Sequence, residues 1–260
     1  MTVNDTAQPE PVQTEPAASG TTGSAEATPR PRVVLIGGAS GSGKSFLARR
    51  YGRPHLPLDS FYRPQSEDAA EGGDGPAFPR TPYGEIDWDD PGTWNGPAAV
   101  EAIVQLRQTG TAQIPDYDIS TSSIVGTVPL HLEYGNGSEA DASGAGASGA
   151  GASGAGGVGG PIVAEGIFAT QMPALLEAAG VPFDAWYIDQ SPVTTAVRRF
   201  ARDVAERRKP IPFLLQRGWA LFRTDGARKQ AAVDAGFVAR STADMQHDLF
   251  AMAGAPAEDA

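Results

Sequence analysis

The chain has 260 residues, a formal net charge of −11 at pH 7 and no cysteine. A chain without cysteine forms no disulfides or thiolate metal sites, which is unfavourable for a small secreted scaffold. The negative charge argues against general nucleic-acid binding, which depends on cations that neutralise phosphates. The three histidines, His55, His131 and His247, are isolated in the sequence and lack partners at zinc-ligand spacing, so we interpret them as surface or packing residues.

Two stretches lack the large apolar side chains that a folded core needs. Residues 1–31 consist mainly of Pro, Thr, Ala, Ser and Glu, which predicts a disordered tail, and residues 135–160 are almost wholly Gly, Ala and Ser, which predicts a flexible insertion. The sequence shows neither the positively charged start and apolar h-region of a signal peptide nor the apolar run of ~20 residues that a membrane span needs. We therefore expect a cytoplasmic protein without membrane contact. Its one folded domain spans residues 32–225 and is followed by a weakly helical segment, residues 226–260.

The most informative motif lies near the start of the folded part. The apolar run Val33–Ile36 predicts a strand, and Phe46–Tyr51 predicts a helix. The eight residues between them fit G-x-x-x-x-G-K-[ST], which in this context predicts a loop that binds nucleotide phosphates. Lys44 would reach the β- and γ-phosphates, and Ser45 would offer its hydroxyl to Mg²⁺. We therefore expect ATP and Mg²⁺ at Gly38, Ala39, Ser40, Gly41, Ser42, Gly43, Lys44 and Ser45.

Two acidic residues that end predicted strands are candidates for chemistry. Asp59 ends a short predicted strand that starts at Leu56, and Glu165 ends an apolar strand that starts at Pro161. Because the carboxyl ends of parallel strands line the ligand crevice, both acids would lie beside the phosphate loop. Asp59 would accept a proton from an alcohol, the alternative being a solvated turn aspartate. Glu165 would hold Mg²⁺ directly or through water, the alternative being an exposed strand end.

Helical and extended patterns alternate along the remaining chain. After a long acidic loop, residues 65–90, a helix is predicted at residues 95–110 with an Asn cap and a Gly stop, and short extended segments at residues 123–132. Beyond the insertion, a helix is predicted at residues 173–179 and a strand at residues 183–188. This alternation predicts an α/β fold with a mostly parallel sheet covered on both faces.

The segment after the last of these strands concentrates positive charge in an acidic protein. Residues 191–204 predict a helix with one apolar face, and residues 198–209 carry six cations against two acids. Taken alone, this pattern is typical of a solvated helix face with pairs at helical spacing. Beside a bound triphosphate, guanidinium groups would instead bridge phosphate oxygens as the helix closed. Residues 211–222 predict one more helix.

Together these features resemble the uridine kinase and phosphoribulokinase-like group of P-loop kinases, and are most similar to uridine kinases. The resemblance runs from about Arg32 to Arg223, excludes the insertion, and includes five further motifs in the family's order. They are Leu58–Arg63 (D-S-F-Y), Trp88–Trp94 (F-D-H-P-D-A-F), Ile114–Asp118 (I-P-x-Y-D), Ala164–Ala169 (E-G-I-x-A) and Arg198–Arg207 (R-R-x-x-R-D-x-x-E-R).

The resemblance implies a P-loop three-layer fold with a helical lid, and transfer of the ATP γ-phosphoryl group to the 5′-hydroxyl of a pyrimidine nucleoside. It implies that Asp59 is the base on that hydroxyl, that Asp89 holds sugar hydroxyls and that Tyr117 shapes the base pocket. Lid arginines would close over the phosphates beside Lys44: Arg199 on the acceptor side, and Arg202 and Arg207 on ATP.

Two departures from the family pattern concern the acceptor. Ser122 stands five residues after the motif tyrosine, where uridine kinases place a histidine against the pyrimidine, and in the lid Arg208 and Lys209 replace glycine and arginine. Lysine lacks the bidentate fork of arginine. A sugar phosphate, pantothenate or another small metabolite is therefore an alternative acceptor. An ATP-binding sensor without an acceptor is a second alternative, which Asp59 disfavours. The oligomeric state and the choice between ATP and GTP stay open.

Overall fold

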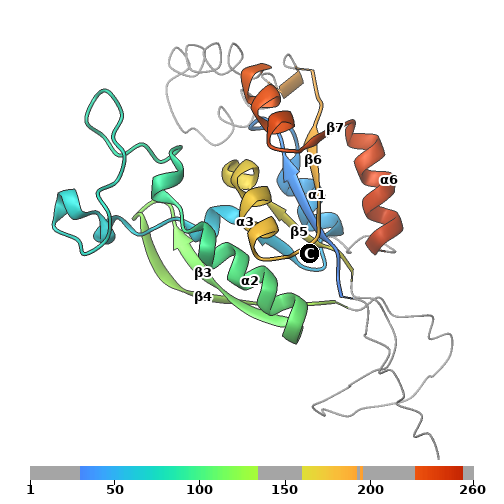
Figure 1. Ribbon diagram of the computed structural model, residues 1–260, viewed down its shortest axis with the longest axis horizontal. Coiled ribbons are helices and arrows are strands. Elements are labelled where there is room, and N and C mark those ends of the chain that lie inside the picture. Colours follow the sequence, from blue (N-terminus) through green and yellow to red (C-terminus); the bar gives the residue numbers. More distant parts are fainter. Residues whose placement is uncertain (1–29, 134–159, 192–193, 196–225, 254–260) are drawn as a thin grey trace, which may run out of the picture.

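The computed structural model describes residues 30–133, 160–191, 194–195 and 226–253. Its centre is a sheet with the strand order β2-β5-β1-β6-β7, in which neighbouring strands are parallel (Figure 1). A separate antiparallel sheet pairs β3 with β4. The strands are β1 (Val33–Gly37), β2 (His55–Pro57), β3 (Thr111–Asp118), β4 (Ser123–His131), β5 (Ile162–Glu165), β6 (Phe183–Ile188) and β7 (Val238–Arg240); the helices are α1 (Lys44–Tyr51), α2 (Gly96–Thr109), α3 (Met172–Ala178) and α6 (Thr242–Ala253).

The two strands at the heart of the sheet are buried along their whole length. Every residue of β1 and of β5 is buried, and such continuous apolar strands suit a parallel sheet covered on both faces. Their register pairs Val33 with Ile162 and Ile36 with Glu165. The carboxyl ends of β1 and β5 therefore meet at one edge of the sheet, beside the loop that follows β1.

Helices cover both faces because side chains along a strand alternate in direction. Val34 and Val163 lie in a cluster with residues of α1 and α6. Val33 and Ala164 lie in a larger cluster with residues of α2 and α3. The sheet is thus the middle of three layers, and the predicted α/β fold with a parallel sheet is confirmed.

The second sheet is a hairpin that packs against α2. Asn95 caps α2 through its side chain, which accepts a hydrogen bond from the backbone N–H of Ala98, and Gly110 ends the helix in the left-handed conformation, as predicted. The chain then continues directly into β3, which pairs with β4 from Thr111 opposite His131 to Asp118 opposite Ser123. The extended segment at 123–132 was predicted, but its long partner strand was not.

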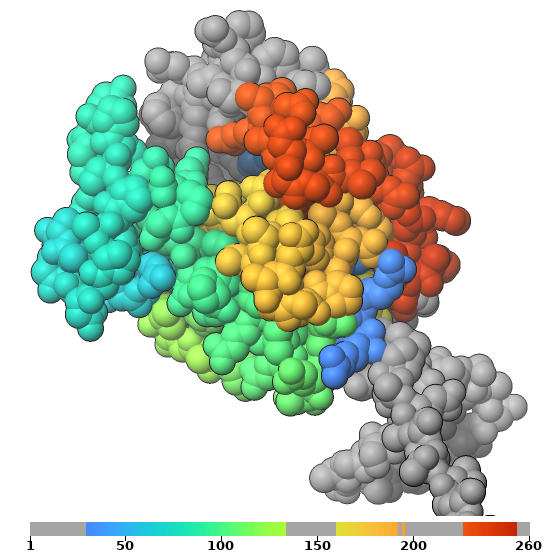
Figure 2. Space-filling view, in the orientation of Figure 1, coloured from blue at the N-terminus to red at the C-terminus, as the bar shows by residue number. Residues whose placement is uncertain are grey.

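The long acidic loop after β2 is organised around a buried carboxylate. One oxygen of Asp68 accepts hydrogen bonds from the backbone N–H groups of Ala70 and Phe78, each at 3.0 Å, and the other pairs with Arg80. Short 3-10 turns occupy Gln65–Glu67, Ala69–Glu71 and Pro91–Thr93. Figure 2 shows this segment, in cyan and teal, as a lobe at the side of the molecule. The loop is therefore a defined structure that leads to Trp88 and Asp89.

The part of the chain after Gly226 differs from the expectation of weak helical patterns. Residues 226–234 are helical, β7 extends the central sheet by pairing with β6, and α6 packs against α1. Ala232, Phe237, Met245 and Leu249 from this part are buried in the two clusters. This part of the chain therefore completes the sheet and the core.

Several expectations concern residues outside the described ranges. They are the tail at 1–29, the insertion at 134–159, most of the arginine-rich segment and the helix predicted at 211–222. At the edges of the insertion, the backbone N–H of Gly160 donates to the carbonyl of Glu133 at 3.2 Å, so the two flanks lie side by side. Among the described residues, no helix combines the length and the apolar character required to cross a bilayer.

Candidate active site

The glycine-rich loop lies between the carboxyl end of β1 and the start of α1, as predicted. Gly41 and Gly43 have φ angles of 83° and 98°, which favour glycine. At Gly38, an added Cβ would lie 2.7 Å from the Ser42 hydroxyl oxygen. The N–H of Ser42 donates to the carbonyl of Ala39 at 3.0 Å and closes the turn. These positions explain why three glycines are needed to bend the backbone here.

The amino end of α1 and the Lys44 side chain direct positive charge toward this loop. Lys44 is the first residue of α1, and its Nζ donates to the carbonyls of Gly38 at 2.9 Å and Ala39 at 3.2 Å. The side chain therefore folds back over the loop. Because a helix amino end carries unpaired N–H groups and a partial positive charge, the arrangement is suited to an anion.

One cavity, with a volume of about 630 Å³, joins this loop to three of the predicted acidic residues. Ser42 is buried and does not line it, and its hydroxyl has no hydrogen-bond partner. Tyr117 is not among the lining residues, and Arg199, Arg202 and Arg207 lie outside the described ranges. The predicted residues that do line the cavity are Gly38, Ala39, Ser40, Gly41, Gly43, Lys44, Ser45, Asp59, Asp89 and Glu165.

Asp59 reaches the cavity from a 3-10 turn, because β2 ends at Pro57 and Leu58–Phe61 form that turn. The expectation that Asp59 ends the strand was therefore slightly wrong. Its Oδ1 accepts a hydrogen bond from the backbone N–H of Ile167 at 3.2 Å. Burial raises the pKa of Asp59, the charge of Glu165 adds to the rise, and the hydrogen bond from Ile167 opposes it. A carboxylate with a raised pKa is a stronger base than an ordinary aspartate.

Glu165 ends β5 as predicted and is surrounded by partners that favour its charged form. The residue is 7 % exposed, and its Oε1 lies 3.3 Å from His55 Nε2. Burial by itself would raise the pKa of Glu165, but the hydrogen bond and charge of His55, the charge of Lys44 and a hydrogen bond from Ser45 hold the pKa below its ordinary value. Two neighbouring carboxyl groups are therefore shifted in opposite directions, which suits them to different roles.

The pairing of Ser45 with Glu165 provides the kind of donor set that Mg²⁺ uses. Mg²⁺ prefers oxygen ligands and is commonly held by one or two carboxylates together with substrate phosphates. Ser45 brings a hydroxyl and Glu165 a buried carboxylate to the same point. Across the residues that the structure describes, no group of three or more His, Cys, Asp or Glu side chains could hold a metal. The residues therefore fit a Mg²⁺ ion that arrives with a nucleotide.

The open side of the cavity carries an acid and a cation. The Asp89 side chain is 76 % exposed, and its Oδ2 lies 3.9 Å from a guanidinium nitrogen of Arg228. Arg228 comes from the helical residues 226–234, and Arg49 of α1 also lines the cavity. Sequence reasoning missed Arg228 because the pattern after Gly226 gave no indication that this segment packs against the phosphate loop.

An aromatic cluster lies beside Asp59 and Asp89. The ring of Tyr62 contacts Tyr117 and Phe168 at centroid distances of 5.4 Å each, and Trp88 at 5.8 Å. Burial raises the pKa of Tyr62, and the negative charges of Asp59 and Asp89 raise it further. Tyr62 is therefore the member of the cluster that the charges of Asp59 and Asp89 affect.

Ser122 contacts the aromatic cluster at Tyr117. Burial raises the pKa of Tyr117, while a hydrogen bond with the Ser122 side chain opposes the rise. Ser122 itself has a φ of 49°, which is uncommon for a residue with a Cβ, and its carbonyl accepts a hydrogen bond from the N–H of Gln65. The residue that departs from the uridine kinase pattern therefore touches the predicted base-pocket tyrosine.

His55 has a partner that the sequence did not indicate. It was interpreted as a surface or packing residue; it starts β2, and its imidazole packs against the carboxylate of Glu165. The two residues are 110 positions apart and become neighbours only because β2 and β5 pair. No local pattern in the sequence signals this contact.

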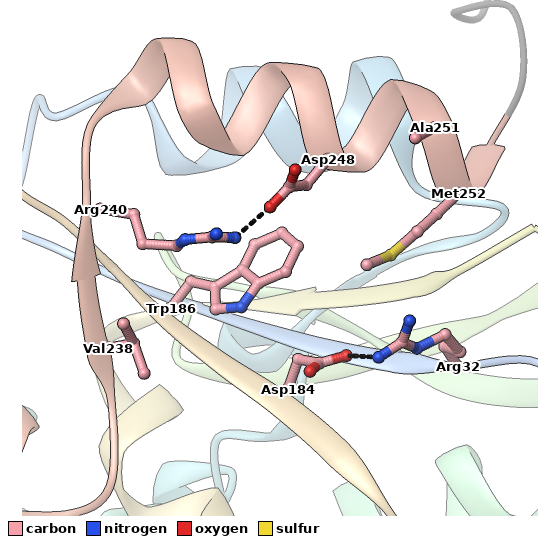
Figure 3. A pocket seen from close by; sticks show the side chains of 8 residues that line it. All are labelled: Arg32, Asp184, Trp186, Val238, Arg240, Asp248, Ala251 and Met252. Atoms are coloured by element: carbon pink, nitrogen blue, oxygen red, sulfur yellow. Dashed lines mark hydrogen bonds and ion pairs between the residues drawn. The ribbon is translucent and has the colours of Figure 1, made fainter.

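A second cavity, of about 600 Å³, lies between α6 and the strands β6 and β7, beside Arg32, the residue before β1 (Figure 3). The guanidinium of Arg240 stands 4.9 Å from the ring centroid of Trp186 and pairs with Asp248, and Arg32 pairs with Asp184 at 2.8 Å. Each of these two cations therefore has a carboxylate partner. Neither the glycine-rich loop nor the predicted acids line this second cavity.

Comparison with known proteins finds likenesses among solved structures but none in sequence. No protein-family profile matches the chain, and no curated protein matches it. A solved structure described as a "putative fructose transport system kinase" from Silicibacter sp. TM1040 is 14% identical; the match covers 80% of this chain and 87% of that chain, with a TM-score of 0.44. At that distance no activity transfers, and the account of the site rests on this chain's own residues.

Proposed function

We propose that the protein is an ATP-dependent phosphotransferase that phosphorylates a hydroxyl group of a small molecule, with the 5′-hydroxyl of a pyrimidine nucleoside as the acceptor. One observation carries the proposal: the glycine-rich loop, Asp59 and Glu165 line the same cavity. Phosphoryl transfer needs a cradle for the donor phosphates, a place for a divalent ion and a carboxylate near the nucleophile, and these residues supply all three.

In the proposed reaction, the loop N–H groups and Lys44 hold the ATP phosphates at the start of α1. Asp59 takes the proton of the acceptor hydroxyl while the hydroxyl oxygen forms a bond to the γ-phosphorus. At the same time the bond between the γ-phosphorus and the β–γ bridging oxygen breaks, and ADP leaves. Ser45 and Glu165 would hold Mg²⁺, which neutralises charge on the β- and γ-phosphates when bound. The arginines predicted for the lid, Arg199, Arg202 and Arg207, would supply further positive charge.

The aromatic cluster supports a nucleoside as the acceptor. Tyr62 lies close enough to Asp59 and Asp89 for their charges to raise its pKa, and it packs against Tyr117, so a flat base that enters beside the cavity would meet aromatic rings while Asp89 binds the sugar hydroxyls. Asp89 is exposed at the mouth of the cavity, which suits a residue that receives an incoming acceptor. The resemblance of the surrounding motifs to uridine kinases points to the same acceptor.

Arg228 favours a second class of acceptor that carries its own negative charge. A guanidinium beside Asp89 has no evident partner on a neutral nucleoside, whereas a sugar phosphate or the carboxylate of pantothenate would pair with it. Substitution of Arg228 by Met separates the two classes. The KM for an anionic acceptor would rise, while the KM for uridine would stay near its original value.

The test is a coupled phosphotransfer assay with the purified protein, ATP and Mg²⁺ against uridine, cytidine, sugar phosphates and pantothenate. We expect ADP release that depends on the acceptor, with the highest kcat/KM for a pyrimidine nucleoside. ATP binding without acceptor-dependent turnover across the panel would instead support a sensor. Turnover only with charged acceptors would replace the nucleoside with the class that Arg228 favours.

A further inference from the structure

The histidine that starts β2 is held against the acid that ends β5. β2 and β5 are parallel neighbours, with His55 opposite Val163 and Pro57 opposite Glu165. Side chains two positions apart on a strand point to the same face, so His55 and Glu165 lie on one face of the sheet. The imidazole leans along the strands, and its Nε2 reaches Oε1 of Glu165 at 3.3 Å.

The position of His55 separates it from the reacting groups. Its side chain is 20 % exposed on the edge strand β2, and it does not line the cavity that contains Glu165 and Ser45. A bound nucleotide or acceptor in that cavity would therefore meet Glu165 and not the imidazole. Any effect of His55 on the reaction has to pass through the Glu165 carboxylate.

Glu165 has two further partners, and the proposed function gives both of them other tasks. Lys44 acts on Glu165 through its charge and Ser45 through a hydrogen bond. When a nucleotide and its cation bind, Lys44 turns to the phosphates and the Ser45 hydroxyl to the cation. Of these three partners in the described part of the chain, His55 is then the one that still interacts with the Glu165 carboxylate. A buried carboxylate needs such a partner to keep one orientation.

We propose that His55 is a positioning residue for the divalent cation: its Nε2–H donates to Oε1 of Glu165, fixes the rotation of the carboxylate and leaves the remaining lone pairs of Glu165 to the metal. This inference rests on the proposed role of Glu165 as a Mg²⁺ ligand. A purely structural ion pair is the competing interpretation. It differs because a structural pair would affect folding stability and leave metal affinity unchanged in the folded protein.

The test measures Mn²⁺ binding to the full chain in the presence of ADP, by the loss of the free Mn²⁺ signal in electron paramagnetic resonance. His55→Leu removes the donor and should weaken Mn²⁺ binding by roughly 10-fold or more, the usual effect of losing a group that orients a metal ligand. His55→Gln keeps an N–H at a similar reach and should restore most of the affinity. His247→Gln, on the exposed surface of α6, is the matched control and should bind as the original protein does.

The outcomes separate this inference from the function on which it rests. If the original protein with ADP binds no Mn²⁺, the proposed metal site is wrong and the role of His55 is lost with it. If the original protein binds Mn²⁺ and folded His55→Leu binds it equally well, the metal site stands and the positioning role is wrong. Equal losses in His55→Leu and His55→Gln would also overturn the specific role of the Nε2–H donor.

A measurement on the unsubstituted protein covers the case in which His55→Leu does not fold. Nitrogen-15 NMR of the imidazoles should show a proton on Nε2 of His55, and adding Mg²⁺ to the ADP complex should shift the His55 nitrogens while those of His247 stay in place. Unchanged His55 nitrogens on Mg²⁺ addition, in a complex that binds Mg²⁺, would overturn the proposal.

Discussion

The cavity at the phosphate loop and the cavity under α6 have similar volumes, about 630 and 600 Å³, but different charge arrangements. Under α6, both arginines have carboxylate partners and one also covers a tryptophan ring. At the carboxyl ends of the strands, a glycine loop and a helix amino end face three acids, two of which have pKa values shifted in opposite directions. Volume alone therefore does not identify the site; the arrangement of charges does.

The difference has a physical origin in the direction of the strands. Parallel strands bring all their carboxyl ends to one edge, where loops such as residues 38–43 and 58–61 gather polar groups. The second cavity is instead a seam between α6 and the strands β6 and β7 (Figure 3). Variants in one cavity can therefore be compared with matched variants in the other.

The largest expected effect is the loss of turnover in Asp59→Asn. The substitution removes the proposed base while keeping the size of the side chain, so kcat should fall by roughly 10²- to 10⁴-fold. ATP affinity, measured by titration calorimetry, should stay near normal because the phosphate loop is untouched. Asp248→Asn in the second cavity is the matched control and should leave kcat unchanged. Full activity in Asp59→Asn would remove the base from the account.

A smaller loss of turnover is expected from Gly166→Ala. An added Cβ would lie 2.6 Å from Asp59 Oδ1 and 2.8 Å from Leu58 Cβ, so the base would be displaced without being removed. Misplacing a reacting group by about 1 Å costs up to about 100-fold, and we expect kcat to fall by roughly 10- to 100-fold. Gly126→Ala in β4, where no atom lies within 4 Å of the new Cβ, is the control. Equal kcat values for the two variants, both folded by circular dichroism, would contradict the close approach at Gly166.

In the second cavity, Arg240→Met should change stability and leave catalysis alone. The variant loses the pair with Asp248 and the stacking on Trp186, contacts that each contribute up to about 1 kcal/mol when partly exposed. Chemical denaturation should show a decrease in unfolding free energy on that scale, with an unchanged kcat/KM. A marked loss of kcat/KM in the folded variant would show that the second cavity also serves the reaction.

The smallest effect expected is a gain of stability in Asp59→Asn at neutral pH. Burial raises the pKa of Asp59 in the folded state, so the folded protein binds the carboxyl proton of Asp59 more tightly than the unfolded chain does. The free energy of unfolding therefore falls as the pH rises from the pKa in the unfolded chain through the pKa in the folded protein. Asparagine avoids that loss. The melting temperature of Asp59→Asn should therefore be higher than that of the original protein at pH 7, and the gain should vanish as the pH falls below the unfolded pKa. A lower melting temperature than the original at pH 7 would contradict the raised pKa.

The features predicted correctly from the sequence depend on residues that are close together in the chain. The strand, glycine loop and helix around Lys44, the cap at Asn95 and the buried strand that ends at Glu165 each follow from a pattern of a few residues. In each case the local preference agrees with the final packing, so the structure adds detail and changes little.

The features that were missed depend on distant parts of the chain. The contact between His55 and Glu165 exists only once β2 and β5 pair, and Arg228 enters the cavity only because residues 226–234 pack beside it. β7 has three residues, too few for a period of two to be recognised. The turn of the β3–β4 hairpin uses Ser122 with a positive φ, where sequence rules lead one to expect glycine or asparagine.

The structure of the protein with Mg²⁺ and a non-hydrolysable ATP analogue would show whether the phosphate loop and Asp59 serve one site. We expect the triphosphate along residues 38–45, the metal between Ser45 and Glu165, and the γ-phosphate on the side of the cavity that Asp59 lines. A triphosphate bound elsewhere, or one with its γ-phosphate directed away from Asp59, would show that the loop and Asp59 do not act together.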